Sequence, residues 1–111
     1  MRDDRARLLD ILEAIDKIEQ RALAGKEQFL VDELLQVWMI HHVQIIGEAA
    51  SRLSGSLRTC SPSVPWDDVI AMRNVLVHQY FGIDLEEVWG TVFFDIPALR
   101  SSIEKVLDEL G

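Results

Sequence analysis

The stretch Glu27–Leu53, EQFLVDELLQVWMIHHVQIIGEAASRL, decides the fold of this 111-residue chain. It has no proline and a single glycine, and its apolar residues recur every three or four positions, the period of an α-helix. They form one stripe of Val31, Leu34, Leu35, Trp38, His42, Ile45, Ala49 and Leu53, and a second of Val37, Ile40, Gly47 and Ala50. A helix that is apolar on two faces is either central or shared with another chain. We therefore predict one long central helix and a two-fold homodimer.

Helical patterns also occupy the segments on both sides of this stretch. A first helix is predicted from Asp4 to Ala24, where Gly25 ends it. Glycines, prolines and serines over residues 54–65 indicate a connecting loop. A third helix then begins at Pro65 and runs to Gln79. The acidic residues of its first turn complement the positive end of the helix dipole.

The last segment begins with a capping pattern, Asp84 followed by Glu87. Its apolar positions continue to Leu110, but Pro97 cannot sit in an undisturbed helix, so the segment kinks there or restarts with Asp95 as its cap. No stretch alternates in the manner of a strand. The sequence predicts a single domain over residues 1–111, folded as an all-α up-and-down bundle of four to five helices.

Composition limits the kinds of function that remain. The chain is 49% hydrophobic, which argues against disorder, and it carries a net charge of −8, which is unfavourable for binding nucleic acid over the whole surface. Any contact with nucleic acid therefore needs a local basic site. The single cysteine, Cys60, fits a reducing compartment, and we see neither a signal peptide nor an apolar run long enough for a membrane. We expect a cytoplasmic protein.

Two adjacent histidines and one charged pair stand out on the central helix. His41 and His42 point in different directions, so they cannot chelate one metal ion, and no metal site or cofactor is expected. We predict that His42 is a packed, hydrogen-bonded interior residue and that His41 lies at the surface or an interface. Glu48 and Arg52 are spaced for a helical ion pair. That pair is a solvated bridge, or else Glu48 orients a catalytic group on a neighbouring helix.

The third helix carries the most unusual stretch of the chain, Met72–Tyr80, MRNVLVHQY. Arg73 falls within the apolar stripe, and a cation there needs an acidic partner or an anionic ligand. Asn74 and His78 are four positions apart on the neighbouring face. Tyr80 lies where its ring could project into a groove.

These residue types suit metal-independent RNA cleavage. Such cleavage needs a base for the ribose 2′-hydroxyl, a cation for the phosphate and an acid for the 5′-oxygen. A histidine can serve as base or acid, and an arginine matches phosphate oxygens. Arg73 and His78 are separated by roughly 140° on a regular helix. A dimer could place both copies of the motif along one cleft and supply two histidines.

Residues 73–80 resemble the R-N-x-x-x-H-x-Y signature of HEPN-domain proteins, and the surrounding sequence is closest to the HepT-like subfamily. Further matches, in the same order and spanning most of the chain, are Ile45–Ala49, Val64–Trp66, Tyr80–Asp84 and Val88–Trp89. The resemblance implies an all-α dimer that acts as the ribonuclease toxin of a toxin–antitoxin system. It implies that Arg73 and His78 are catalytic and that Asn74 supports them. It further implies that a MntA-like nucleotidyltransferase antitoxin silences the toxin by attaching AMP to Tyr80.

Two other interpretations remain open at this point. In one, the domain is a non-catalytic subunit of a nucleotidyltransferase complex, and the motif holds a nucleotide or a segment of the partner. In the other, the motif is structural, and Arg73 pairs with an interior carboxylate such as Glu48. Loss of Arg73 would then destabilise the fold, because breaking a buried pair leaves the other charge uncompensated.

Overall fold

The computed structural model describes residues 3–78 and 84–110, and the side chains of all of these except 74–78. The elements in chain order are α1 (Asp4–Ala22), α2 (Lys26–Val31), α3 (Glu33–Ser51), α4 (Gly55–Cys60), α5 (Trp66–His78), α6 (Leu85–Gly90), a π-helical segment η2 (Thr91–Asp95) and α7 (Ile96–Leu110). The described residues form no strand, so the predicted all-α class is confirmed.

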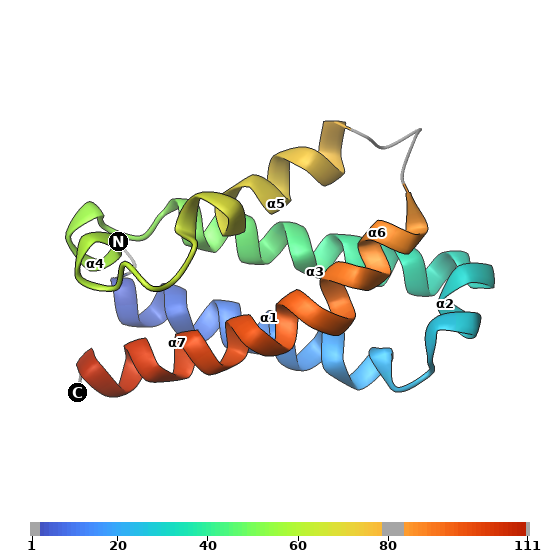
Figure 1. Cartoon of the computed structure of the whole chain (residues 1–111), viewed down its shortest axis with the longest axis horizontal. Coiled ribbons are helices and arrows are strands. Elements are labelled where there is room, and N and C mark those ends of the chain that lie inside the picture. Colours follow the sequence, from blue (N-terminus) through green and yellow to red (C-terminus); the bar gives the residue numbers. More distant parts are fainter. Residues whose placement is uncertain (1–2, 79–83, 111) are drawn as a thin grey trace.

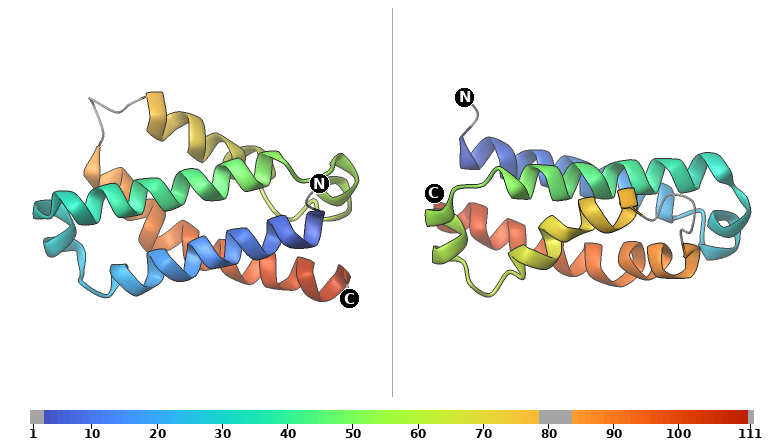
Figure 2. Two further views of the ribbon diagram at one scale, coloured as in Figure 1. Left: turned by 180° about the vertical axis from the view of Figure 1, so that it is seen from behind. Right: turned by 90° about the horizontal axis from the view of Figure 1, so that it is seen from above.

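Helix α3 lies at the centre of the bundle, with α1 packed on one side and α5 on another (Figure 1). Successive long segments run in opposite directions, and α6, η2 and α7 form one continuous return path alongside α1 (Figure 2). The short α2 closes one end of the bundle and the short α4 closes the other. This is the up-and-down arrangement that the sequence predicts.

The core is built from the apolar stripes of these helices. The most deeply buried side chains come from α1, α2, α3, α5 and the continuous segment from α6 to α7: Leu8, Ile11, Ile15, Ile18, Phe29, Met39, Val43, Ile46, Val69, Val92, Ile96 and Ile103. Each such side chain contributes roughly 1.5–3 kcal/mol by leaving water. The core therefore fixes α3 against α1 on one face and against α5 on another.

The predicted long central helix is wrong at its amino-terminal end. Asp32 adopts extended backbone angles (φ −111°, ψ 101°) and divides the segment into α2 and α3. Its carboxylate accepts a hydrogen bond from the backbone N–H of Leu35 (3.1 Å) and another from the amide of Gln28 (3.1 Å). Because the chain turns at this cap, Val31 and Leu34 are 80% and 83% exposed instead of contributing to the predicted buried stripe.

Other predicted boundaries also differ from the structure. The predicted loop over residues 54–65 contains α4, which Ser54 caps by accepting a hydrogen bond from the N–H of Leu57 (3.1 Å). The first helix ends at Ala22, and Gly25 instead precedes α2 with a positive φ of 91°. That conformation suits glycine, which has no Cβ.

The start of the last segment is as predicted, and of the two alternatives predicted at Pro97, the restart with Asp95 as its cap is wrong. The Asp84 carboxylate accepts hydrogen bonds from the N–H groups of Glu86 (3.0 Å) and Glu87 (3.3 Å), as a cap does. The segment neither stops nor restarts at Asp95, because the wider π-helical turn η2 leads directly into α7. A proline ring clashes with the carbonyl four residues before it in an α-helix, and the π turn lies at that point.

Candidate functional site

Helices α3 and α5 approach each other closely at Gly47. A Cβ atom added to this glycine would lie 2.8 Å from the Cβ of Arg73 and 2.8 Å from its backbone nitrogen. No side chain larger than hydrogen fits there without moving α5. The small residues of the central helix were predicted to permit close helix approach, and at Gly47 the neighbour is α5 of the same chain. This contact fixes the position of the Arg73 backbone and Cβ, from which its side chain extends to the surface.

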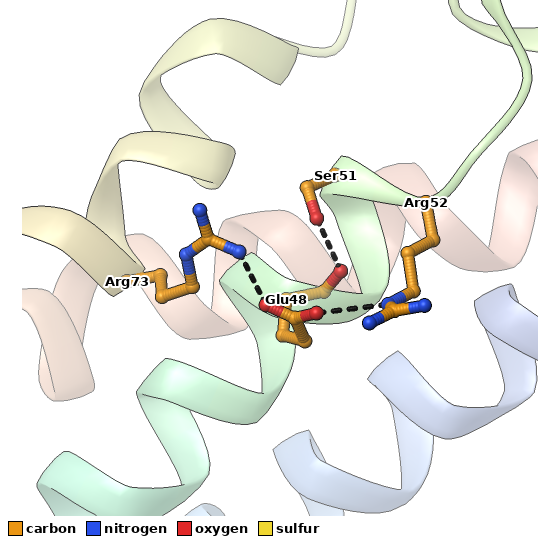
Figure 3. Close-up of polar contacts among 4 residues, drawn as sticks. All are labelled: Glu48, Ser51, Arg52 and Arg73. Carbon is orange, nitrogen blue, oxygen red and sulfur yellow. Dashed lines mark hydrogen bonds and ion pairs between the residues drawn. The ribbon is translucent and has the colours of Figure 1, made fainter.

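The guanidinium of Arg73 reaches the carboxylate of Glu48, the residue that follows this glycine (Figure 3). Its Nη1 donates to Oε2 of Glu48. The other oxygen, Oε1, accepts a hydrogen bond from Nε of Arg52 at 2.8 Å. One carboxylate therefore holds two guanidinium groups, one from α5 and one from the carboxyl end of α3. We call Glu48, Arg52 and Arg73 the arginine–glutamate cluster.

The arginine–glutamate cluster is open to solvent. The side chains of Arg73, Glu48 and Arg52 are 38%, 41% and 57% exposed. Glu48 also lines a groove of about 290 Å³ between α1 and α3. The structural alternative, in which Arg73 is sealed inside against a carboxylate, is thus only half right. The carboxylate partner is Glu48, as that alternative supposed, but the pair lies at the surface.

Charge in the cluster favours an anionic ligand. Hydrogen bonds from Arg73 and then Arg52 lower the pKa of Glu48 below its ordinary value. The carboxylate therefore stays ionised at neutral pH, and its contribution to stability is lost only as the pH falls through the lowered pKa. Two permanent cations and one anion leave a local charge of +1 on a chain whose total is −8. The cluster is thus locally cationic. The groove that Glu48 lines also carries side chains whose charges cancel, namely Arg7, Lys17, Asp10 and Glu13.

The cluster belongs to a longer exposed face of α3. Positions 34, 37, 41, 48 and 52 lie within about 60° of one another on a helix of 3.6 residues per turn. Leu34 and Val37 are 83% and 56% exposed, and His41 is exposed as well. The face is apolar towards its amino-terminal end and charged towards its carboxyl end.

The two adjacent histidines behave as predicted. His42 is buried, and its Nδ1 donates to the carbonyl oxygen of Trp38 at 2.8 Å. Burial lowers its pKa. His41 is at the surface. Within residues 3–78 and 84–110, no three histidine, cysteine, aspartate or glutamate side chains are grouped so as to hold a metal ion.

The structure thus brings two of the predicted site residues together, Arg73 and Glu48. Asn74 and His78 belong to α5, but their side chains lie outside the described part of the chain, and so does the whole of Tyr80. Arg52 was predicted only as the partner of Glu48, and its place beside Arg73 follows from the packing of α3 on α5. The spacing of Glu48 and Arg52 alone could not show that the same carboxylate reaches another helix.

None of the described helices is long and apolar enough to cross a bilayer. No solved structure matches the chain.

Comparison with known proteins is informative at the level of sequence. The chain is 40% identical over 101 residues to a protein of Thermococcus cleftensis named "Probable ribonuclease HepT", covering 89% of this chain and 91% of the relative. It is 37% identical over 106 residues to a Methanocaldococcus jannaschii protein named "Putative RNase", covering 95% and 97% of the two chains. The family model described as "Ribonuclease HepT-like" matches residues 11–106. This chain belongs to the HepT-like ribonuclease family.

Proposed function

We propose that this protein is a metal-independent endoribonuclease that acts in the cytoplasm as the toxin of a two-gene toxin–antitoxin system. The ribonuclease activity is supported by membership of the HepT-like family. The structural observation that carries the proposal is the half-buried side chain of Arg73, whose guanidinium is held by Glu48 in a locally cationic cluster. A cation held in place in this way can receive an RNA phosphate without rearranging the core.

In the proposed reaction, Arg73 binds the scissile phosphate through its planar guanidinium. A histidine, His78, takes the proton from the ribose 2′-hydroxyl, and the 2′-oxygen attacks phosphorus. The bond from phosphorus to the 5′-oxygen breaks, and a general acid protonates the departing oxygen. The products are a 2′,3′-cyclic phosphate and a free 5′-hydroxyl. Asn74 supports a phosphate oxygen or the imidazole, and Glu48 positions Arg73.

A homodimer would complete the acid and base pair. The exposed apolar residues Leu34 and Val37 lie on the same face of α3 as Glu48 and Arg52. Apolar side chains on one exposed face favour burial against another protein surface. If a two-fold axis buries this face, the motifs of both chains approach one cleft, and two His78 side chains can divide the roles of acid and base.

The proposed antitoxin is a MntA-like nucleotidyltransferase that attaches AMP to Tyr80. This part of the proposal is supported by the R-N-x-x-x-H-x-Y signature in residues 73–80. An anionic adduct two residues after His78 would block access to the site and compete with RNA phosphate for Arg73.

The experiment that tests the proposed activity is incubation of the purified, unmodified protein with single-stranded RNA in EDTA. We expect cleavage products that carry 2′,3′-cyclic or 3′-phosphate ends. Intact RNA after prolonged incubation, together with tight nucleotide binding or stable association with a nucleotidyltransferase, would contradict the proposal. That outcome would favour a non-catalytic subunit of a nucleotidyltransferase complex.

A further inference from the structure

Arg52 is fixed beside the proposed catalytic arginine by the same carboxylate. Only its Nε is bonded to Glu48, at 2.8 Å, and the side chain is 57% exposed. An arginine has five N–H donors in a planar fork, so the terminal nitrogens of Arg52 remain able to bind another anion. No described contact of Arg52 other than the one with Glu48 involves its guanidinium.

The backbone also holds Arg52 in place. It caps the carboxyl end of α3, where its N–H donates to the carbonyl oxygen of Ala49 at 3.1 Å. In the same turn, the Ser51 hydroxyl donates to the carbonyl oxygen of Glu48 at 2.7 Å (Figure 3). The backbone that carries both Glu48 and Arg52 is therefore well ordered by local bonds. The bond from Nε to Glu48 then restrains the side chain itself, so Arg52 loses less freedom when it binds a ligand.

The two guanidinium groups come from different helices, Arg73 from α5 and Arg52 from the carboxyl end of α3, and both contact Glu48. Each bonds to a separate oxygen of Glu48, so they flank a single carboxylate on an exposed surface. A polyanion with regularly spaced charges can contact both guanidinium groups at once. A single small anion can be bound by one of them alone. RNA is such a polyanion, with one phosphate per nucleotide.

We propose that Arg52 is a second RNA-contacting residue, which binds a phosphate adjacent to the scissile phosphate held by Arg73. This inference rests on the proposed ribonuclease function and adds a residue that positions the substrate. Arg52 increases affinity for the strand and sets its register in the site, while Glu48 holds the two arginines side by side. Because Arg52 does not touch the reacting atoms, its loss affects binding more than the chemical step.

The test compares Arg52→Gln with Arg52→Lys and with Lys105→Gln, an exposed charge on α7 used as the control. We expect Arg52→Gln to raise KM for single-stranded RNA about tenfold, equivalent to about 1.4 kcal/mol, and to change kcat by less than about threefold. Arg52→Lys keeps the charge and loses the fork, so an intermediate KM is expected. Lys105→Gln should match the wild type. Thermal unfolding of each variant shows that the fold is retained.

Equilibrium binding in a His78→Ala background separates affinity from cleavage. Arg52→Gln should weaken binding and reduce the dependence of log K on log salt by about 0.7, the value for one phosphate contact on a single strand. Glu48→Gln should strengthen binding, because it removes the only anion of the cluster, and should lower kcat by freeing Arg73.

An unchanged KM and salt dependence for Arg52→Gln, in a protein whose wild type cleaves RNA, would overturn the role of Arg52 and leave the nuclease proposal intact. Weaker binding by both Arg52→Gln and Glu48→Gln would also overturn it, since the ion pair would then matter only for structure. A wild type that neither binds nor cleaves RNA would overturn the proposed function itself.

Discussion

Arg73 and Arg100 are both bound to carboxylates on another helix, but their environments differ. Arg100, on α7, contacts Glu19 at 2.5 Å and also Asp16, both on α1, and its side chain is 29% exposed. Arg73 contacts Glu48 across α3 and α5 and is 38% exposed. The Arg100 ion pairs connect the two long helices α1 and α7, whereas the Arg73–Glu48 pair lies at the surface.

We therefore predict that Arg73→Ala lowers the free energy of unfolding by about 1 kcal/mol or less, as expected of a solvent-screened pair. Alanine keeps the Cβ that packs on Gly47. Arg100→Ala should lower the free energy of unfolding by more than Arg73→Ala does. Urea unfolding of both variants measures the difference. A larger loss for Arg73→Ala than for Arg100→Ala would indicate that Arg73 has mainly a structural role.

Buried His42 predicts how stability depends on pH. Burial lowers its pKa from the ordinary value of 6.5, so the unfolded chain takes up a proton at a higher pH than the folded chain does. The free energy of unfolding should therefore decrease as the pH falls through 6.5 towards the lowered pKa. In His42→Gln this slope should be shallower. Unfolding curves collected between pH 8 and pH 5 measure it, and equal slopes in the two proteins would refute the assignment.

At the scale of the helix, Gly47 decides how α3 and α5 fit together. In Gly47→Ala the new Cβ would lie 2.8 Å from the Cβ and 2.8 Å from the backbone nitrogen of Arg73, and neither atom can move away by side-chain rotation. We expect a loss of about 1–3 kcal/mol in the free energy of unfolding, typical of overpacking, together with reduced RNA cleavage. Gly90→Ala is the matched control, because a Cβ there meets nothing within 4 Å.

In Gly90→Ala, stability should be unchanged or increase by up to about 1 kcal/mol, since alanine restricts the unfolded chain more than glycine does. Thermal unfolding and a cleavage assay on both variants complete the comparison. Equal behaviour of the two variants would mean that the approach of α5 to Gly47 is not tight in solution.

Predictions from the sequence succeed where local periodicity and tertiary packing agree. The start of α5 after Pro65, the Asp84 cap and the buried His42 all follow from side-chain chemistry within one turn of helix. The break at Asp32 does not, because aspartate is tolerated in a helix and becomes a cap only when the chain must turn. Pro97 likewise predicts a disturbance of the preceding helical turn, but not that a π turn accommodates it without a break in the helix.

The site is predictable to a similar degree. An arginine within an apolar stripe predicts an acidic partner or an anionic ligand, and Glu48 was among the carboxylates considered. What the sequence lacks is the distance between α3 and α5. That distance depends on Gly47, and it brings Arg73 to a carboxylate already paired with Arg52.

For the whole molecule, the exposed apolar side chains of α3 predict self-association. We expect a dimer at micromolar concentration by sedimentation, and we expect Val37→Glu to shift it towards monomer and to reduce cleavage. Leu23→Glu is the control, since Leu23 is 88% exposed but follows α1 and is not on the α3 face. A wild type that is monomeric at this concentration, or equal effects of both variants, would contradict the proposed dimer surface.

The proposed silencing by a MntA-like antitoxin can be tested on the same protein. Incubation with a MntA-like nucleotidyltransferase and ATP should add the mass of AMP groups to Tyr80 and stop cleavage. Tyr80→Phe should remain unmodified and active in the presence of the enzyme. Full inhibition of Tyr80→Phe under these conditions would show that the nucleotidyltransferase inhibits the protein through a site other than Tyr80.

The central claim is that Arg73 and His78 act together on an RNA phosphodiester. The most direct measurement is the single-turnover rate of RNA cleavage in EDTA for the wild type, Arg73→Ala and His78→Ala, with unfolding curves that show all three proteins folded. The account predicts cleavage by the wild type and a loss of at least about a hundredfold in each variant. Cleavage at the wild-type rate by either folded variant would contradict it.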